Sequence, residues 1–258
     1  MIFKLLFTYF KNINAHEIHL RCTKTGITFF TRDHQQTSKV FAHISGEHVN
    51  WYYCEEEFWI GLDRLSVEKI FSSIDKTLYK ISMIYTNDEP DFLVLILKDP
   101  EVCRDDNYKI NLINFIRDND LYEVEETINP IGISERFPVE FTFSEAQFKK
   151  VISNASHFSD TITIEKYDKH NLQLTCSKSN LIYKSVFRDD EKIKLRTDIE
   201  EGQNFRATIK INNIKSLASS MVTEDVKVLC REHDDMLFQS AISTKALIVS
   251  TLIVLGDM

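Results

Sequence analysis

The chain has 258 residues and a mass of 30.2 kDa, which corresponds to one large domain or two modest ones. Its hydrophobic fraction of 43%, with only 6 glycines and 4 prolines, excludes the collagen-like, linker-like and disordered classes. The formal net charge of −8 argues against a simple basic nucleic-acid-binding protein, but it leaves room for a local basic surface.

The five cysteines are Cys22, Cys54, Cys103, Cys176 and Cys230. Their number is odd, they are widely scattered, and no CxxC pair occurs. This pattern favours reduced thiols in an intracellular protein over a disulfide framework or a zinc site. The apolar stretches at the two ends are too short to cross a bilayer, so we expect no targeting or transmembrane segment.

The first half of the chain is predicted to contain two helices and several short strands. Apolar residues at helical spacing predict helices over 2–13 and 65–74, the second with Leu65, Ile70, Phe71 and Ile74 on its apolar face. Alternating patterns predict strands over 17–22, 26–31, 40–44, 51–53, 79–85, 92–97 and 108–116.

The stretch from Arg117 to Phe137 interrupts this pattern. It is acidic, it contains Pro130 and Gly132, and it has neither a strand period nor a helix period. We interpret residues 120–136 as a connector between an N-terminal domain, 1–119, and a C-terminal domain, 137–258. The alternative is a solvated loop inside one domain.

The second half repeats the order of elements in the first. Ser144 caps a predicted helix over 144–155, and a second helix is expected over 211–221. Strands are predicted over 161–166, 172–176, 181–187, 205–209, 226–230, 237–242 and 246–255. Corresponding helices lie about 144 positions apart, which indicates a duplicated domain and an α+β fold class.

The predicted helices are basic although the chain is acidic. They carry two acids, Glu68 and Glu145, and six lysines, namely Lys4, Lys11, Lys69, Lys149, Lys150 and Lys215. That gives the helices a charge of +4 and leaves −12 for the remainder. Lysines beside serine, asparagine and threonine suit contact with a phosphate backbone, whereas outward lysines on ordinary solvated helix faces are the simpler alternative.

Several segments resemble DNA sliding clamps of the PCNA family. The resemblance lies in residues 65–74, in 137–165 and in 172–177. The stretches IFKLLFTYFKN (2–12), GITFFTRD (26–33), VEKIFSSID (67–75) and IKSLASSMVT (214–223) more closely resemble PCNA-like proteins of large DNA viruses of the African swine fever virus kind. The resemblance extends over nearly the whole chain.

This resemblance implies a DNA-clamp fold of two similar domains, each with two helices on a sheet-rich shell. Three copies would close into a homotrimeric ring around double-stranded DNA and act as a processivity factor in viral DNA replication. The implied partners are the DNA backbone, further copies of the chain, the viral DNA polymerase and other replication or repair proteins. No enzymatic activity, cofactor, metal or membrane is implied, and the implied location is inside the host cell at viral replication sites. A clamp-fold scaffold for viral transcription or repair, in a hetero-ring, is the alternative.

The resemblance also implies roles for particular residues. The six lysines would face the DNA, although Ser72 and Ser153 stand where clamps often carry a basic residue. The implied subunit interface comprises Tyr108, Ile110, Leu112, Leu181, Tyr183 and Ser185. The implied partner-peptide pocket comprises Ile128, Pro130, Ile131, Ile133 and Leu252.

Two features depart from the family pattern. Ile253 and Val254 replace the Ala-Pro pair that follows the last strand in the family. The chain also opens on a helix, where clamps have a strand first, so either that strand is lost or the sequence is short.

No Walker loop, GxGxxG, HExxH or CxxC motif occurs. The sequence from His16 to His19 is HExH, which overlaps a predicted strand and does not place two histidines one helical turn apart. The acidic runs 55–57 and 189–191 suit either solvated loops or a Mg²⁺ site. A metal-dependent nuclease is therefore a second alternative, in which the acidic runs would hold the metal.

Overall fold

The computed structural model describes residues 2–34, 38–72, 80–99, 101, 103–114, 137, 139–166, 171–178, 181–188, 194–197, 205–220, 225–231, 236–242 and 247–253. The helices described are α1 (Ile2–Asn12), α2 (Arg64–Ser72), α5 (Glu145–Phe158), α6 (Ile211–Ser220) and the short 3-10 helix η1 (Gly46–His48). The strands in the first half are β1 (Glu17–Thr23), β2 (Gly26–Arg32), β3 (Ser38–Ser45), β4 (Phe58–Asp63), β5 (Lys80–Ile84), β6 (Phe92–Asp99) and β7 (Arg104–Ile113). Those in the second half are β8 (Val139–Ser144), β9 (Thr161–Lys166), β10 (Asn171–Lys178), β11 (Leu181–Arg188), β12 (Lys194–Thr197), β13 (Phe205–Lys210), β14 (Asp225–Cys230), β15 (Met236–Ile242) and β16 (Leu247–Ile253).

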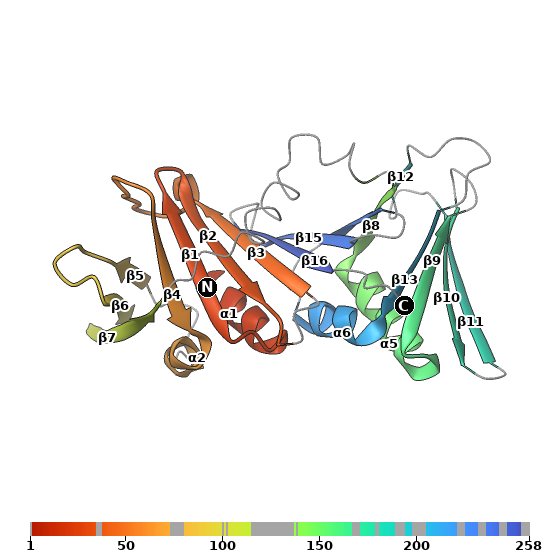
Figure 1. Cartoon of the computed structure of the whole chain (residues 1–258), viewed down its shortest axis with the longest axis horizontal. Coiled ribbons are helices and arrows are strands. Elements are labelled where there is room, and N and C mark those ends of the chain that lie inside the picture. The colour runs from red at the N-terminus through yellow and green to blue at the C-terminus, as the bar shows by residue number, and fades with distance from the viewer. Residues whose placement is uncertain are drawn as a thin grey trace.

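The strands form two antiparallel sheets. The larger has twelve strands in the order β12-β8-β14-β15-β16-β3-β2-β1-β4-β7-β6-β5, and the smaller has four in the order β11-β10-β9-β13. The two halves of the chain meet within the large sheet, where β16 pairs with β3 along residues 247–253 and 38–44. Figure 1 shows this sheet running across the molecule with the α-helices along one side of it.

The repeated order of elements is confirmed by the connections. In the first half, α1 precedes a β1-β2-β3 meander, β4 returns to β1, and α2 precedes a β5-β6-β7 meander. In the second half, α5 precedes β9-β10-β11, β13 returns to β9, and α6 precedes β14-β15-β16. The connector over 120–136 lies outside the described residues, so the domain boundaries stay a prediction.

Local sequence explains the helices. The predicted cap of α5 is present, because Ser144 Oγ accepts a hydrogen bond from the backbone N–H of Gln147 at 3.3 Å. The Gln147 side chain in turn accepts from the Ser144 backbone at 3.3 Å, which completes a capping box. The predicted buried face of α5 is also correct: Phe148, Val151, Ile152 and Ala155 are all buried.

Four details of the sequence-based prediction are wrong. Leu65 is 53% exposed, because the buried face of α2 is built from Val67, Ile70 and Phe71. Residues 51–53 are not in a strand, since no described strand pairs with them. β7 begins at Arg104 and not at 108, because β6 extends to Asp99 and forms a tight hairpin with it. Two short strands, β8 and β12, were not anticipated; they pair with each other across a long sequence separation.

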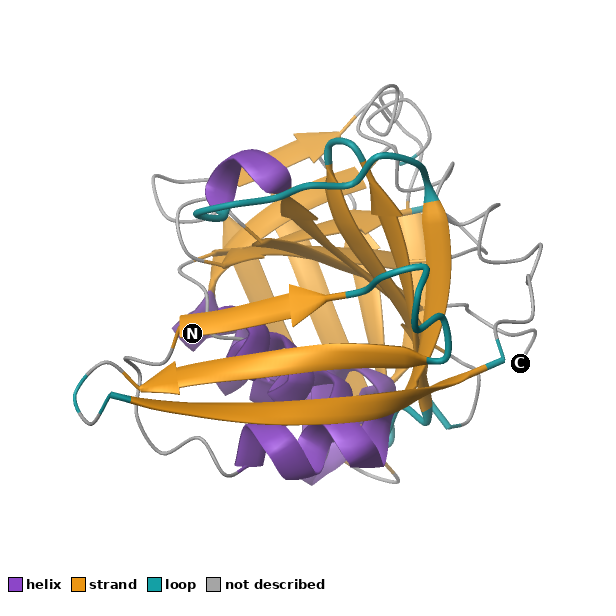
Figure 2. Cartoon of the chain, turned by 90° about the vertical axis from the view of Figure 1, so that its left-hand side faces the viewer, coloured by secondary structure: helices purple, strands orange, loops and turns teal. Residues whose placement is uncertain are grey.

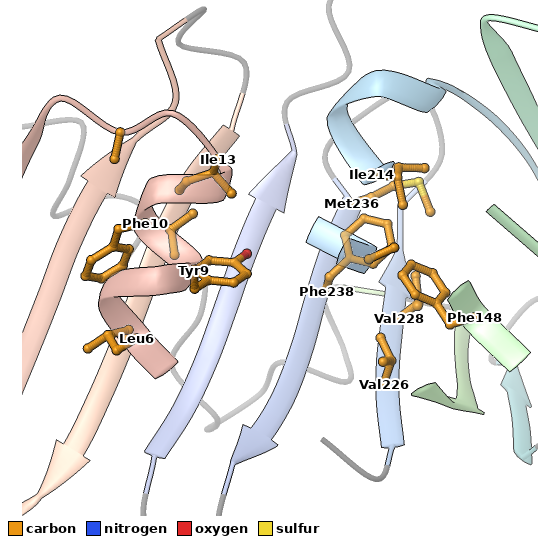
Figure 3. Close-up of a cluster of buried hydrophobic side chains, with 14 of the residues drawn as sticks. Leu6, Tyr9, Phe10, Ile13, Phe148, Ile214, Val226, Val228, Met236 and Phe238 are labelled. Atoms are coloured by element: carbon orange, nitrogen blue, oxygen red, sulfur yellow. The ribbon is translucent and has the colours of Figure 1, made fainter. Parts of the chain in front are cut away.

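The hydrophobic core lies between the helices and the two sheets. Figure 3 shows Leu6 and Phe10 of α1 on one side of it, and Phe148 of α5, Ile214 of α6 and Phe238 of β15 on the other. One buried cluster includes residues of all four α-helices. The packing therefore holds the helices firmly against the sheet.

Phe10→Ala is expected to lower the free energy of unfolding by about 3–5 kcal/mol, because it leaves a cavity in this core. Phe10 is fully buried, and its ring lies 5.9 Å from that of Phe7 and 6.3 Å from that of Phe29, centroid to centroid. Urea denaturation followed by circular dichroism measures the change. Thr8→Ala, at an exposed position on the same helix, is the control and should cost well under about 1 kcal/mol.

Candidate nucleic-acid interface

The four described α-helices form one row. α1 packs against both α2 and α6, and α6 packs against α5, so the order along the row is α2, α1, α6, α5 (Figure 1). Figure 2 shows the row gathered on one side of the sheets, with the short η1 on the opposite side. Since each helix buries one face on the sheet, its other face is turned to this common side.

The six predicted lysines are carried by this row. Lys11, Lys69, Lys150 and Lys215 are exposed, and Lys4 and Lys149 are half-buried. The structure thus brings together residues that are up to 211 positions apart in the sequence. Whether they contact DNA stays a prediction.

Two acids on the same helices partly neutralise these lysines. Lys11 Nζ of α1 lies 2.6 Å from Glu68 Oε1 of α2, and Arg64 donates a hydrogen bond to the other oxygen of Glu68. The hydrogen bond from Lys11, together with the positive charges of Lys11 and Arg64, holds the pKa of Glu68 below its usual value. Glu68 therefore stays ionised at neutral pH and competes with any phosphate for Lys11.

A second pair lies within α5, where Lys149 donates to Glu145 one helical turn earlier. Lys69, Lys150 and Lys215, by contrast, form no ion pair with any residue in the described part of the chain. The positive charges of those three lysines are therefore the most available for binding a polyanion. The i, i+4 spacing signals the pairs Arg64–Glu68 and Glu145–Lys149, but only the packing of α1 on α2 reveals Lys11–Glu68.

Glu68→Gln is expected to strengthen binding of duplex DNA about 2- to 5-fold, because it removes the carboxylate that holds Lys11 and Arg64. The slope of log affinity against log salt should steepen by about one. Fluorescence anisotropy with a labelled 30-base-pair duplex at several salt concentrations measures both. Glu89→Gln is the matched control: Glu89 pairs with Lys109 at 2.8 Å but lies on no helix, so its removal should leave DNA affinity unchanged.

The two strands of the predicted subunit interface both offer an open sheet edge. β11 ends the four-stranded sheet and pairs only with β10 among the described residues. β7 pairs with β6 along its length, but on its other side, among the residues described, only Leu112 and Ile113 pair with β4. Beside this open part of β7 lies a groove of about 600 Å³, which Ser66, Lys69 and Ile70 of α2 line together with residues 107–111 of β7.

The six predicted interface residues do not share one environment. Leu181 is 53% exposed, and Ile182 and Val186 of the same strand are 70% and 50% exposed. Tyr183 stacks on Phe158 of α5 at 5.2 Å between ring centroids, and Ser185 is half-buried like Tyr108 and Leu112. Ile110 is buried in the core of its own chain. Leu181, with the exposed apolar Ile182 beside it, is therefore the most available of the six for contact with another copy.

The predicted partner-peptide pocket falls largely outside the described residues. Ile128, Pro130, Ile131 and Ile133 are in the part of the chain that the structure does not describe. Leu252 is on β16, opposite Lys39 of β3 and Leu237 of β15. The pocket as a unit stays a prediction.

The two histidines of the HExH sequence have different neighbours in the structure. His16 Nε2 lies 2.9 Å from His34 Nδ1, whereas His19 Nε2 lies 3.6 Å from Glu17. Among the residues described, no group of three His, Cys, Asp or Glu side chains is arranged to hold a metal ion. The acidic run 189–191 lies outside these residues.

None of the helices that the structure describes is both long enough and apolar enough to span a membrane.

Comparison with known proteins identifies relatives of two kinds. Residues 1–121 match the family model described as proliferating cell nuclear antigen, N-terminal domain. The chain is 39% identical over 254 residues to the uncharacterized protein E301R of African swine fever virus, both in the Kenya 1950 isolate and in the Badajoz 1971 strain. The alignment covers 98% of this chain and 83% of each viral protein. It is also 24% identical over 163 residues to proliferating cell nuclear antigen of Saccharomyces cerevisiae, which covers 63% of this chain and 58% of that protein.

Proposed function

Because the chain belongs to the proliferating cell nuclear antigen (PCNA) family, we propose that it is a DNA sliding clamp that acts as a processivity factor in viral DNA replication. Three copies would form a ring around duplex DNA and tether the viral DNA polymerase. The observation that carries this proposal is the single row of four helices with lysines on its outward face. The family consists of non-enzymatic scaffolds, so the chain is not an enzyme.

Topological retention on DNA explains why a weakly basic helix row is sufficient for a clamp. A ring does not leave DNA when a single contact breaks, so its inner surface needs only mobile, sequence-independent contacts with phosphate. Three lysines that form no ion pair with the described residues, and two that are paired with Glu68 and Glu145, suit such contacts better than a strongly basic surface would. An overall charge of −8 is then compatible with DNA binding, since the phosphates meet only the helix row.

The open edges of β7 and β11 support head-to-tail association. An exposed sheet edge with apolar side chains is a liability unless it is covered, and a closed ring of identical heterologous contacts would cover these two edges in every copy. We assign β11 of one copy to the open part of β7 of the next. The same proposal assigns residues 1–119 and 137–258 to two clamp domains, and the protein to viral replication sites in the host cell.

Multi-angle light scattering at several protein concentrations tests the ring directly. A mass near three times 30.2 kDa supports the homotrimer, and a single-chain mass at every concentration contradicts it and favours the hetero-ring alternative. Retention on circular DNA tests encirclement. Protein that stays with closed circular duplex through gel filtration, but is lost when the DNA is then linearised, is held topologically; equal retention on both forms contradicts the clamp role.

A further inference from the structure

Two large aromatic side chains are displayed on the surface after η1. Trp51 is 79% exposed and Tyr53 is 68% exposed. Their rings stack on each other, with centroids 6.3 Å apart and planes inclined by 22°. Exposed aromatic side chains that gather in this way are typical of interaction surfaces.

The backbone that carries this pair is held firmly from below. The Tyr52 hydroxyl lies 2.6 Å from the Thr23 carbonyl oxygen and 2.9 Å from that of Gly26. Gly46 lets the Tyr52 ring approach, since a Cβ at that position would lie 2.7 Å from the ring. Side chains alternate along an extended segment, so with Tyr52 directed inward, Trp51 and Tyr53 are directed outward. The pair is thus fixed before any partner arrives, which lowers the entropy cost of binding.

Carboxylates adjoin the aromatic rings. Glu55, Glu56 and Glu57 follow directly and are all exposed, and the Tyr53 hydroxyl lies 3.4 Å from Glu55 Oε2. Aromatic faces together with a carboxylate are the groups that bind a guanidinium, because its plane stacks on a ring while its N–H groups reach the acid. The same groups would repel the phosphates of a nucleic acid.

The chain itself contains this arrangement two residues further on. The Arg21 guanidinium donates to both oxygens of Glu57, at 3.0 Å each, and its carbon lies 5.5 Å from the centroid of the Trp59 ring. Glu57 and Trp59 therefore already hold an arginine of the same chain. Tyr53 and Glu55 repeat this pairing of an aromatic ring with an acid two positions away, but they present it to the solvent.

We propose that Trp51, Tyr53 and Glu55 form a binding site for an arginine side chain on an extended segment of a partner protein. The site follows η1, which lies on the side opposite the helix row (Figure 2). The β1–β4 ladder ends near the site at Cys22 and Phe58, and it reaches α2 at its other end, at Glu17 and Asp63. A partner bound there leaves the lysines of the helices accessible. The protein can then hold DNA and this partner simultaneously.

The test uses the whole chain and a fluorescein-labelled peptide, acetyl-Gly-Arg-Gly-Arg-Gly-amide, followed by fluorescence anisotropy at low salt. The double variant Trp51→Ala/Tyr53→Ala should weaken peptide binding about tenfold, and Glu55→Gln about threefold. Asp88→Asn removes an exposed carboxylate from the β5–β6 turn and should change nothing.

Three results would overturn the proposal. One is an equal loss of affinity in Asp88→Asn and Glu55→Gln, which would mean that the peptide is attracted only by the net negative charge. Another is equal binding of the corresponding lysine peptide, because a stacked, forked guanidinium discriminates against an ammonium. The third is a loss of oligo-thymidine binding in the double aromatic variant, which would identify the pair as a platform for single-stranded DNA. All three variants change exposed side chains, and circular dichroism verifies that they fold.

Discussion

Reversing the charge of three lysines, with Lys69→Glu, Lys150→Glu and Lys215→Glu, is expected to weaken the binding of duplex DNA at low salt by about 10- to 100-fold. These lysines are exposed on α2, α5 and α6 and form no ion pair within the described chain, so their charge is available to phosphates. The slope of log affinity against log salt should become shallower by about three, one for each lost phosphate contact. Because the side chains are exposed, folding should be almost unaffected, as urea denaturation would verify.

The matched control reverses three exposed lysines that lie on no helix, namely Lys24→Glu, Lys80→Glu and Lys98→Glu. Both variants have the same net charge, so a general repulsion of DNA would affect them equally. A loss confined to the helix variant supports the helix row as the DNA-facing surface. Comparable losses in both variants would show that net charge, and not this surface, controls binding. A further variant with Lys4, Lys11 and Lys150 reversed should lose less affinity, since Glu68 already holds Lys11.

Ile182→Asp is expected to convert the proposed trimer to single chains at micromolar concentration. Ile182 is 70% exposed on β11, which has an unpaired edge in the described structure. If β11 pairs with β7 of another copy, Ile182 becomes buried at the junction. Burying an isolated carboxylate there costs several kcal/mol, which is about as much free energy as the contact between the two copies contributes. Light scattering should give the mass of one chain, and urea denaturation should give nearly unchanged stability of that chain.

The matched control is Ile84→Asp, which places the same charge on β5, the strand that ends the twelve-stranded sheet in the described structure. Ile84 is 41% exposed, so its change should not disturb folding either. If Ile84→Asp lost association while Ile182→Asp still formed the trimer, the subunit interface would be at β5 and not at β11. A trimer that survives both changes would exclude both edges.

Local patterns in the sequence predicted most of the elements but not all of their surroundings. The strand predicted over 17–22 is present as β1, and its alternate residues Ile18, Leu20 and Cys22 are buried, because a strand period is visible within a few residues. Leu65 was assigned to the wrong face, since it stands in the first turn of α2, where helical spacing fixes the face least well. The strand β12 was missed because four residues are too few to show a period, whereas β8 does show a period of two in Val139, Phe141 and Phe143 that was not recognised.

The candidate site, too, could be predicted from the sequence only in part. The outward lysines follow from helical periodicity, and so does the i, i+4 pair of Glu145 and Lys149. The ion pair between Lys11 and Glu68 depends on how α1 packs on α2, which no local pattern contains. The stacked pair of Trp51 and Tyr53 was hidden for a similar reason: alternation suggested a strand, whereas the segment has no described strand beside it.

The pairing of β3 with β16 has a consequence for synthesis of the chain on the ribosome. β3 emerges early, but the strand that completes its hydrogen bonding is roughly 200 residues later, and at 5–20 residues per second that interval lasts about 10–40 s. Throughout that time the N-terminal half has an uncovered strand edge that other nascent chains can join. β16 therefore both joins the two halves and ends the period in which this edge of β3 is open to aggregation.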